Sequence, residues 1–180
     1  SSTDLPTLYE SANGTVPSNF GLGVLSDAIL CEVTEERNGE YELELEYPVN
    51  GIHAESIAVR RIIKAKPNYT DDPQLFRIYK VNKDLGGSFH VFAQHISYDL
   101  NGYLAAVGSA SGAQAAASYL SNGTPFTIRT GKTSSKVFTV RMPSSVRSYL
   151  AGREGSFLDV YGTAELHYNN YTIDINTNRG

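Results

Sequence analysis

The four histidines are the residues whose chemistry most readily suggests a metal site. His90 and His95 stand five residues apart around the end of a predicted strand, so their side chains point to opposite faces if the strand continues. Zinc sites need convergent ligands, and no cysteine or acidic residue stands at a spacing that completes this pair. His53 and His167 are isolated in the sequence. We therefore predict no metal site and no cofactor.

A catalytic nucleophile is the second chemistry to consider. The chain has no Gly-x-Ser-x-Gly elbow of the kind serine hydrolases use. Cys31 with a distant histidine would make a cysteine peptidase pair. Its place in the middle of a predicted strand favours a buried, inert thiol instead. Asp71 and Asp72 supply too few oxygens for calcium, and Gly21-Leu22-Gly23 lacks the third glycine of a phosphate loop and precedes a strand. We predict no catalytic and no cofactor-binding residue.

Four glutamates alternate with apolar residues along one stretch of the chain: Glu40, Glu42, Glu44 and Glu46. Same-face neighbours on a strand lie ~6.6 Å apart, a separation that the paired carboxylates of glycosidases use. Four carboxylates in register, with Glu32 or Glu36 opposite, are more typical of a solvated or subunit-facing side of a sheet. The sequence leaves open whether this row meets a neighbouring subunit, a channel or solvent.

A predicted β-hairpin is the element around which the rest is organised. Residues 30–36 and 40–47 alternate in polarity, and Asn38-Gly39 between them favours a tight type I′ turn. The apolar face of the second strand consists of Tyr41, Leu43, Leu45 and Tyr47. We predict that this face lies in the core. Leu43→Asp should then abolish soluble folding, because it buries an unpaired charge.

Further strands are expected at residues 5–9, 58–66, 75–82 and 88–94, the last two as a second hairpin. Pro6 favours an edge position for the first of these strands, and residues 11–23 read as a loop. Up to Leu100 the chain is an antiparallel meander, which favours a small barrel or sandwich.

The pattern changes near residue 101. Ser111 and Gln114 match a capping box, and Gly123 can end the helix. The apolar residues between them at helical spacing are Ala113, Ala116, Ala117 and Leu120. Strands are expected at 126–130 and 137–142, short helices from Ser144 or Ser145 and over 156–161, and a third hairpin over 164–168 and 171–175.

The predicted fold class is mainly β with an α+β part. We expect a small antiparallel β-barrel-like domain over residues 1–100, in which the barrel need not be complete, and an α+β domain over residues 101–180. The 180-residue chain is 41% hydrophobic and 19% charged, which is typical of globular proteins. Its net charge of −4 argues against a general nucleic-acid surface. No apolar run approaches the ~20 residues of a membrane span.

Several blocks of the sequence resemble, in order, the N-terminal region of phage minor structural proteins. This is the prophage tail-endopeptidase or tail-associated lysin family of long-tailed phages of Gram-positive bacteria. The matching blocks are residues 23–29, 34–43, 65–68, 72–79, 93–100, 143–148 and 155–162.

The resemblance implies a fold similar to the baseplate hub protein of T-even-type contractile phages. It implies a homotrimer whose barrels form a pseudo-sixfold ring with a central channel, located at the tail tip of the virion and made in the host cytoplasm. The ring would join a hexameric distal tail protein to threefold parts below, with the tape measure protein and other tail-tip proteins as partners. No specific nucleic acid is expected.

Family members continue beyond the segment that resembles residues 174–180, with a second barrel and often a peptidoglycan-cleaving domain. We therefore expect an N-terminal fragment that is not itself an enzyme. The alternative is a peptidoglycan endopeptidase acting through Cys31 or the histidines. A weaker alternative is a carbohydrate- or receptor-binding module, since the chain has twelve tyrosines, but strand packing explains these more simply.

Overall fold

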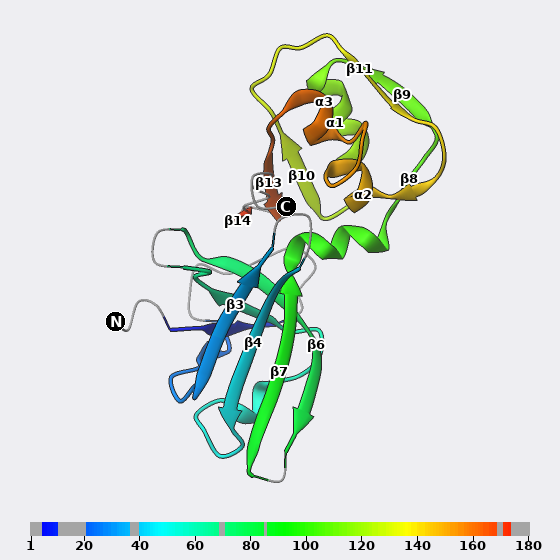
Figure 1. The fold of residues 1–180 in the computed structure, drawn as a ribbon. Coiled ribbons are helices and arrows are strands. Elements are labelled where there is room, and N and C mark those ends of the chain that lie inside the picture. The colour runs from blue at the N-terminus through cyan, green and yellow to red at the C-terminus, as the bar shows by residue number, and fades with distance from the viewer. Residues whose placement is uncertain are drawn as a thin grey trace. The chain divides into compact units, whose positions relative to one another are not determined.

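We describe a computed structural model of the chain. The structure describes residues 5–10, 21–36, 40–68, 71–84, 86–168 and 171–173. The chain forms two compact units, Ser1–Ile96 and Ser97–Gly180 (Figure 1). The domain boundary predicted near residue 101 falls inside the 3-10 helix η3 (Ile96–Gly102), at whose first residue the first unit ends.

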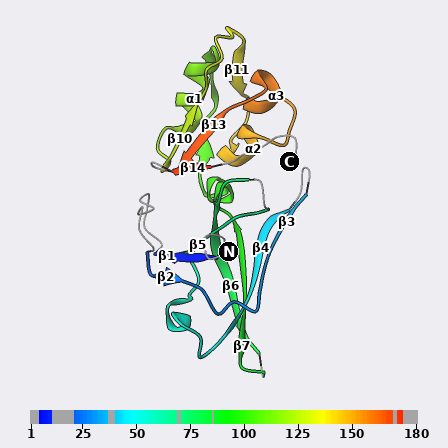
Figure 2. The same ribbon diagram turned by 90° about the vertical axis from the view of Figure 1, so that its left-hand side faces the viewer.

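The first unit is a seven-stranded sheet in the order β2-β1-β5-β6-β7-β4-β3, with antiparallel pairing throughout. The strands are β1 (Thr7–Tyr9), β2 (Gly23–Val24), β3 (Leu30–Glu35), β4 (Tyr41–Pro48), β5 (Ile62–Ala65), β6 (Gln74–Lys83) and β7 (Ser88–His95). A short 3-10 helix, η2, spans Ala54–Ser56. The sheet curls into a half-barrel (Figure 2). The predicted fold class, mainly β with an α+β part, is confirmed.

Two predicted hairpins are present. Strands β3 and β4 pair so that Val33 faces Leu43, and the predicted turn at residues 37–39 lies outside the described residues. Strands β6 and β7 form the second hairpin, with an irregularity between Ile78 and Lys80 that places one extra residue, Tyr79, on β6. Such a bulge increases the local twist of a sheet, which fits the curl of this one.

The core of the first unit lies on the concave side of β4 and its neighbours. Leu43, Leu45 and Tyr47 are at most 1% exposed, so the predicted core face of β4 is confirmed. Tyr41, at the start of the strand, is half-buried. Its ring stacks on His95 with centroids 4.2 Å apart.

Two expectations for the N-terminal strands are wrong. Strand β1 is not an edge, because it pairs with β2 on one side and β5 on the other. Pro6 precedes the strand, where its carbonyl accepts a hydrogen bond from the Leu25 N–H at 2.8 Å. Gly23, predicted in a loop, belongs to β2, whereas residues 11–20 lie outside the described part.

In its described residues, the second unit combines three short sheets with three α-helices, in addition to η3 (Figure 1). The sheets pair β10 with β13 and β14, β9 with β11, and β8 with β12. The strands are β8 (Leu104–Ala105), β9 (Gly108–Ser111), β10 (Phe126–Arg129), β11 (Val137–Val140), β12 (Ser144–Ser145), β13 (Glu165–Tyr168) and β14 (Tyr171–Ile173). The helices are α1 (Ala113–Ser121), α2 (Val146–Leu150) and α3 (Phe157–Tyr161).

The predicted apolar stripe of α1 is buried, as expected from its helical spacing. The capping box is wrong: the N-cap is Gly112, and Ser111 ends β9, where it pairs with Val137. For α2, of the two predicted starting residues, Ser144 and Ser145, the N-cap is Ser145, whose side chain accepts a hydrogen bond from the Ser148 N–H at 3.1 Å. The third hairpin is also present as β13 and β14, with its Asn-Asn turn outside the described residues.

Within the described part of the chain, no helix has the length and apolar character needed to cross a membrane.

Candidate functional site on the outer face of the seven-stranded sheet

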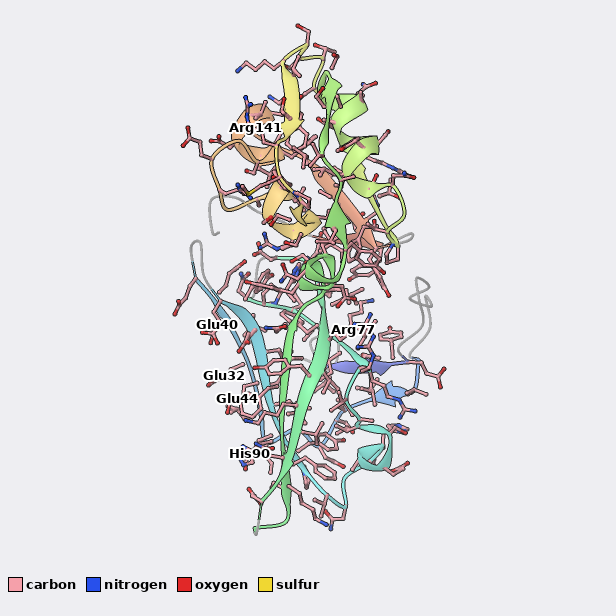
Figure 3. All side chains as sticks on the ribbon, turned by 90° about the vertical axis from the view of Figure 1, so that its right-hand side faces the viewer. Glu32, Glu40, Glu44, Arg77, His90 and Arg141 are labelled. Atoms are coloured by element: carbon pink, nitrogen blue, oxygen red, sulfur yellow. The ribbon has the colours of Figure 1, made fainter. Side chains whose placement is uncertain are left out.

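The outer face of the sheet carries a row of carboxylates. Glu42, Glu44 and Glu46 lie on β4, Glu40 immediately precedes it and Glu32 lies on β3; we call these five residues the acidic face. These side chains lie on the outer face because they alternate along β4 with the buried residues of the core. Figure 3 shows the labelled Glu32, Glu40, Glu44 and His90 along this side of the first unit.

The acidic face brings like charges close together. Glu32 lies directly opposite Glu44 across the β3–β4 pair, an arrangement that destabilises an isolated sheet. The pKa of Glu40 is raised, first because its protonated carboxyl can donate a hydrogen bond to Glu42, and then by the negative charge of Glu42, with smaller contributions from desolvation and from the charge of Glu36. The Tyr79 hydroxyl donates to Glu42 Oε1 at 3.1 Å, which stabilises one carboxylate of the row. The surface therefore carries concentrated negative charge, and bound cations or a basic partner would reduce the repulsion between its carboxylates.

Three side chains that commonly bind metals meet at one end of the acidic face. Glu46 on β4 lies directly opposite His90 on β7, and Asp84 follows β6 at the β6–β7 turn. His90 Nε2 and Asp84 Oδ2 are 2.9 Å apart. One ligand atom from each of the three residues lies within 4.8 Å of the other two.

The backbone of the β6–β7 turn fixes Asp84. Its Oδ1 accepts hydrogen bonds from the N–H groups of Gly86, at 2.9 Å, and Ser88, at 3.0 Å. The Ser88 bond is the main reason that the pKa of Asp84 is lowered, and the contact with His90 adds to it. Linear spacing did not reveal this cluster. Glu46 comes beside His90 through the pairing of β4 with β7, between the two hairpins, and no local sequence signal encodes that pairing.

The other three histidines pack against neighbouring residues of the fold. His95 is 1% exposed, and its Nε2 lies 2.8 Å from Gln74 Oε1. His90 and His95 thus lie on opposite sides of the sheet, as their spacing predicts. His53 packs against Gly23, where an added Cβ would lie 2.3 Å from the ring. Close packing, and not phosphate binding, thus accounts for this glycine. His167 is buried and contacts Glu165 of its own strand.

Cys31 differs from expectation. It is exposed and not buried, because β3 is an edge strand of the open half-barrel. Crowding by surrounding protein atoms, and then the charge of Glu32, raise the pKa of its thiol to about 11. The thiol is therefore almost entirely protonated near neutral pH and a weak nucleophile.

A hollow of about 420 Å³ lies beside Cys31. Its described lining consists of Cys31, Glu32, Val33, Thr34, Lys66, Pro67 and Asn68. Histidine is absent from that described lining, so this hollow does not assemble the cysteine–histidine pair of a peptidase. Asp71, considered above as a calcium ligand, lies three residues after Asn68 and makes two hydrogen bonds with it, at 2.8 and 2.9 Å, as is typical of a turn.

The fold defines a protein with an antiparallel half-barrel followed by a small α+β unit. The solved structure of prophage tail protein gp18 from Listeria monocytogenes EGD-e is similar, with a TM-score of 0.53 and 13% sequence identity. The likeness covers 94% of this chain and 49% of that one, so the chain spans about half the length of that protein. At this identity the likeness shows a shared fold. No protein-family model matches the chain, and no curated protein matches it.

Proposed function

We propose that the chain is a structural component of a long-tailed phage or prophage tail, the N-terminal part of a tail-tip hub protein. The observation that carries this proposal is the shared fold with a prophage tail protein across 94% of the chain, both units included. The ordered sequence blocks that resemble tail proteins support it independently. The chain would thus act by assembly and would reside in the virion.

Peptide mass spectrometry of purified particles tests this placement. Particles from an induced lysogen are separated from free protein on a density gradient and quantified against a tail-tube protein. The chain should co-purify at a fixed, low ratio to the tube protein. A chain that stays in the soluble fraction while tails sediment would contradict the proposal.

We further propose a homotrimer that forms a ring below the distal tail protein, with the tape measure protein and other tail-tip proteins as neighbours. The support is the family resemblance, together with a strongly acidic outer face that a basic neighbouring surface would relieve. Light scattering tests this: one copy has a mass of 19.6 kDa, so three copies would give 58.8 kDa. The mass should be measured with and without the distal tail protein. A monomeric mass in both cases would contradict the ring.

The chain is proposed to have no enzymatic activity of its own. The competing hypothesis is a peptidoglycan endopeptidase that uses Cys31 or a histidine. The high pKa of Cys31 and the burial of His95 favour the non-enzymatic reading. A turbidity assay on cell walls separates the two: no lysis is expected from the chain. Lysis that disappears in Cys31→Ala or His90→Ala would favour the enzyme.

A further inference from the structure

The cluster of Glu46, Asp84 and His90 draws its members from two neighbouring strands, β4 and β7, and from the turn that joins β6 to β7. Glu46 and His90 are directly opposite each other on β4 and β7, so their side chains leave the sheet on the same face. His90 is also opposite Asn82 on β6. Asp84 stands two residues further along, on the same side. The sheet thus places Glu46 and His90 side by side, and the β6–β7 turn brings the Asp84 carboxylate to His90.

The separations within the cluster fit a metal ion. Bonds of about 2.1 Å place neighbouring ligand atoms about 3.0 to 3.4 Å apart and opposed ones about 4.2 Å apart. His90 Nε2 and Asp84 Oδ2 are 2.9 Å apart, the distance of a direct hydrogen bond, so a bound ion would replace this bond and move the two atoms apart by a few tenths of an ångström. All three ligand atoms lie within 4.8 Å of one another, and a rotation of the flexible Glu46 side chain would bring its carboxylate to a shared ion.

Hydrogen bonds orient the Asp84 carboxylate for metal binding. Its Oδ1 is occupied by two backbone N–H donors, which orients Oδ2 toward His90. Secondary hydrogen bonds of this kind fix the ligands of protein metal sites. The side chains of His90 and Asp84 are 34% and 38% exposed, which leaves an open path for an ion and room for water.

We propose that Glu46, Asp84 and His90 bind one divalent transition-metal ion, of which Zn²⁺ is the best match. Histidine nitrogen and Asp or Glu oxygen are both zinc ligands, whereas Ca²⁺ and Mg²⁺ favour oxygen ligands alone. Water, or a side chain of a neighbouring protein, completes the coordination. The neighbouring charges of Glu44 and Glu32 add attraction for a cation.

Binding of an ion would cross-link separate segments of the first unit. A bound ion would join β4 to the β6–β7 turn and would neutralise part of the acidic face. This site goes beyond the proposed function and does not depend on it, since the binding test below uses the isolated chain and no tail protein.

Isothermal titration of the chelator-stripped chain with ZnCl₂ tests the proposal. All proteins carry Cys31→Ser, so that the exposed thiol does not contribute ligands. One equivalent of Zn²⁺ should bind, and a large excess of Mg²⁺ should not displace it. His90→Ala and Asp84→Asn should each weaken binding by at least 10-fold.

Glu44→Gln is the matched control, because it removes a charge from the same strand and face without touching the cluster. It should bind Zn²⁺ within about 3-fold of the parent. Circular dichroism verifies that each variant is folded. As a second readout, Co²⁺ in place of Zn²⁺ should give visible absorption that is lost in His90→Ala.

Three results would overturn the inference. The first is no binding of Zn²⁺ at micromolar concentrations, which leaves His90 and Asp84 as an ordinary ion pair. The second is binding that survives both His90→Ala and Asp84→Asn, which places the ion elsewhere. The third is an equal loss in Glu44→Gln, which indicates only diffuse attraction to the acidic face.

Discussion

Leu43→Ala is the substitution that most sharply tests how β4 is oriented in the sheet. Leu43 is 1% exposed and lies between Val33 on β3 and Ala93 on β7. The change removes three carbon groups, worth about 0.8 kcal/mol each, or about 2.4 kcal/mol. A cavity term adds to this, because Ala93 is too small to fill the space, while the half-buried Val33 on the edge strand can move inward. We expect a loss of about 3 kcal/mol, within the range for buried leucines.

Urea unfolding followed by circular dichroism near 218 nm measures this loss. A unit of this size has a dependence of about 1 kcal/mol per molar urea, so the midpoint should fall by about 3 M. The two units can unfold separately, and only the transition of the first unit should move. Leu43→Asp should yield no soluble folded protein, because the cost of a buried carboxylate is added to the cavity.

Glu44→Ala is the control from the adjacent position on the opposite face. It should change the unfolding free energy by no more than about 0.5 kcal/mol, and the loss of repulsion with Glu32 favours stabilisation. The reasoning would be refuted if Leu43→Ala and Glu44→Ala had equal effects, or if Leu43→Asp were recovered folded and soluble.

Three further predictions follow from single contacts. Because desolvation and the charge of Glu32 raise its pKa to about 11, Cys31 should react with iodoacetamide at pH 8 about 10-fold more slowly than an ordinary thiol, since its lower thiolate fraction is partly offset by the higher nucleophilicity of a more basic thiolate, and it should speed up as the pH approaches 11; labelling at the ordinary rate would contradict this. Ser145→Ala removes the hydrogen bond to the Ser148 N–H and should cost about 1 kcal/mol in thermal unfolding of the second unit; an unchanged melting temperature would count against this cap. Gln74→Leu removes the 2.8 Å hydrogen bond to buried His95 and should cost about 1 to 2 kcal/mol in urea, an expectation that an unaltered midpoint would disprove.

The hairpins and the core face of β4 could be predicted because their signals are local. Alternation along residues 40–47 identifies the buried face without knowledge of the partner strand, and the prediction for Leu43 holds. Ser145 was found for the same reason, since a cap concerns only the first turn of its helix. Ser111 fits the same pattern, but pairing with β11 takes its backbone into a strand, and tertiary pairing overrides local preference.

The remaining errors depend on the order of strands in the sheet. Cys31 is exposed because β3 is at an edge, and β1 is internal because β2 and β5 flank it. Nothing local to these residues encodes that order. The cluster at His90 has the same origin: Glu46 is far from it in sequence and becomes its neighbour only when β4 pairs with β7.

Cryo-electron microscopy of tails from an induced lysogen tests the central claim, assembly into a phage tail, most directly. The account predicts density at the tail tip that accepts the seven-stranded half-barrel in three copies around the tail axis, and separately accepts the α+β unit. Tails whose tip density accepts neither unit, with this chain absent from the particle, would contradict it.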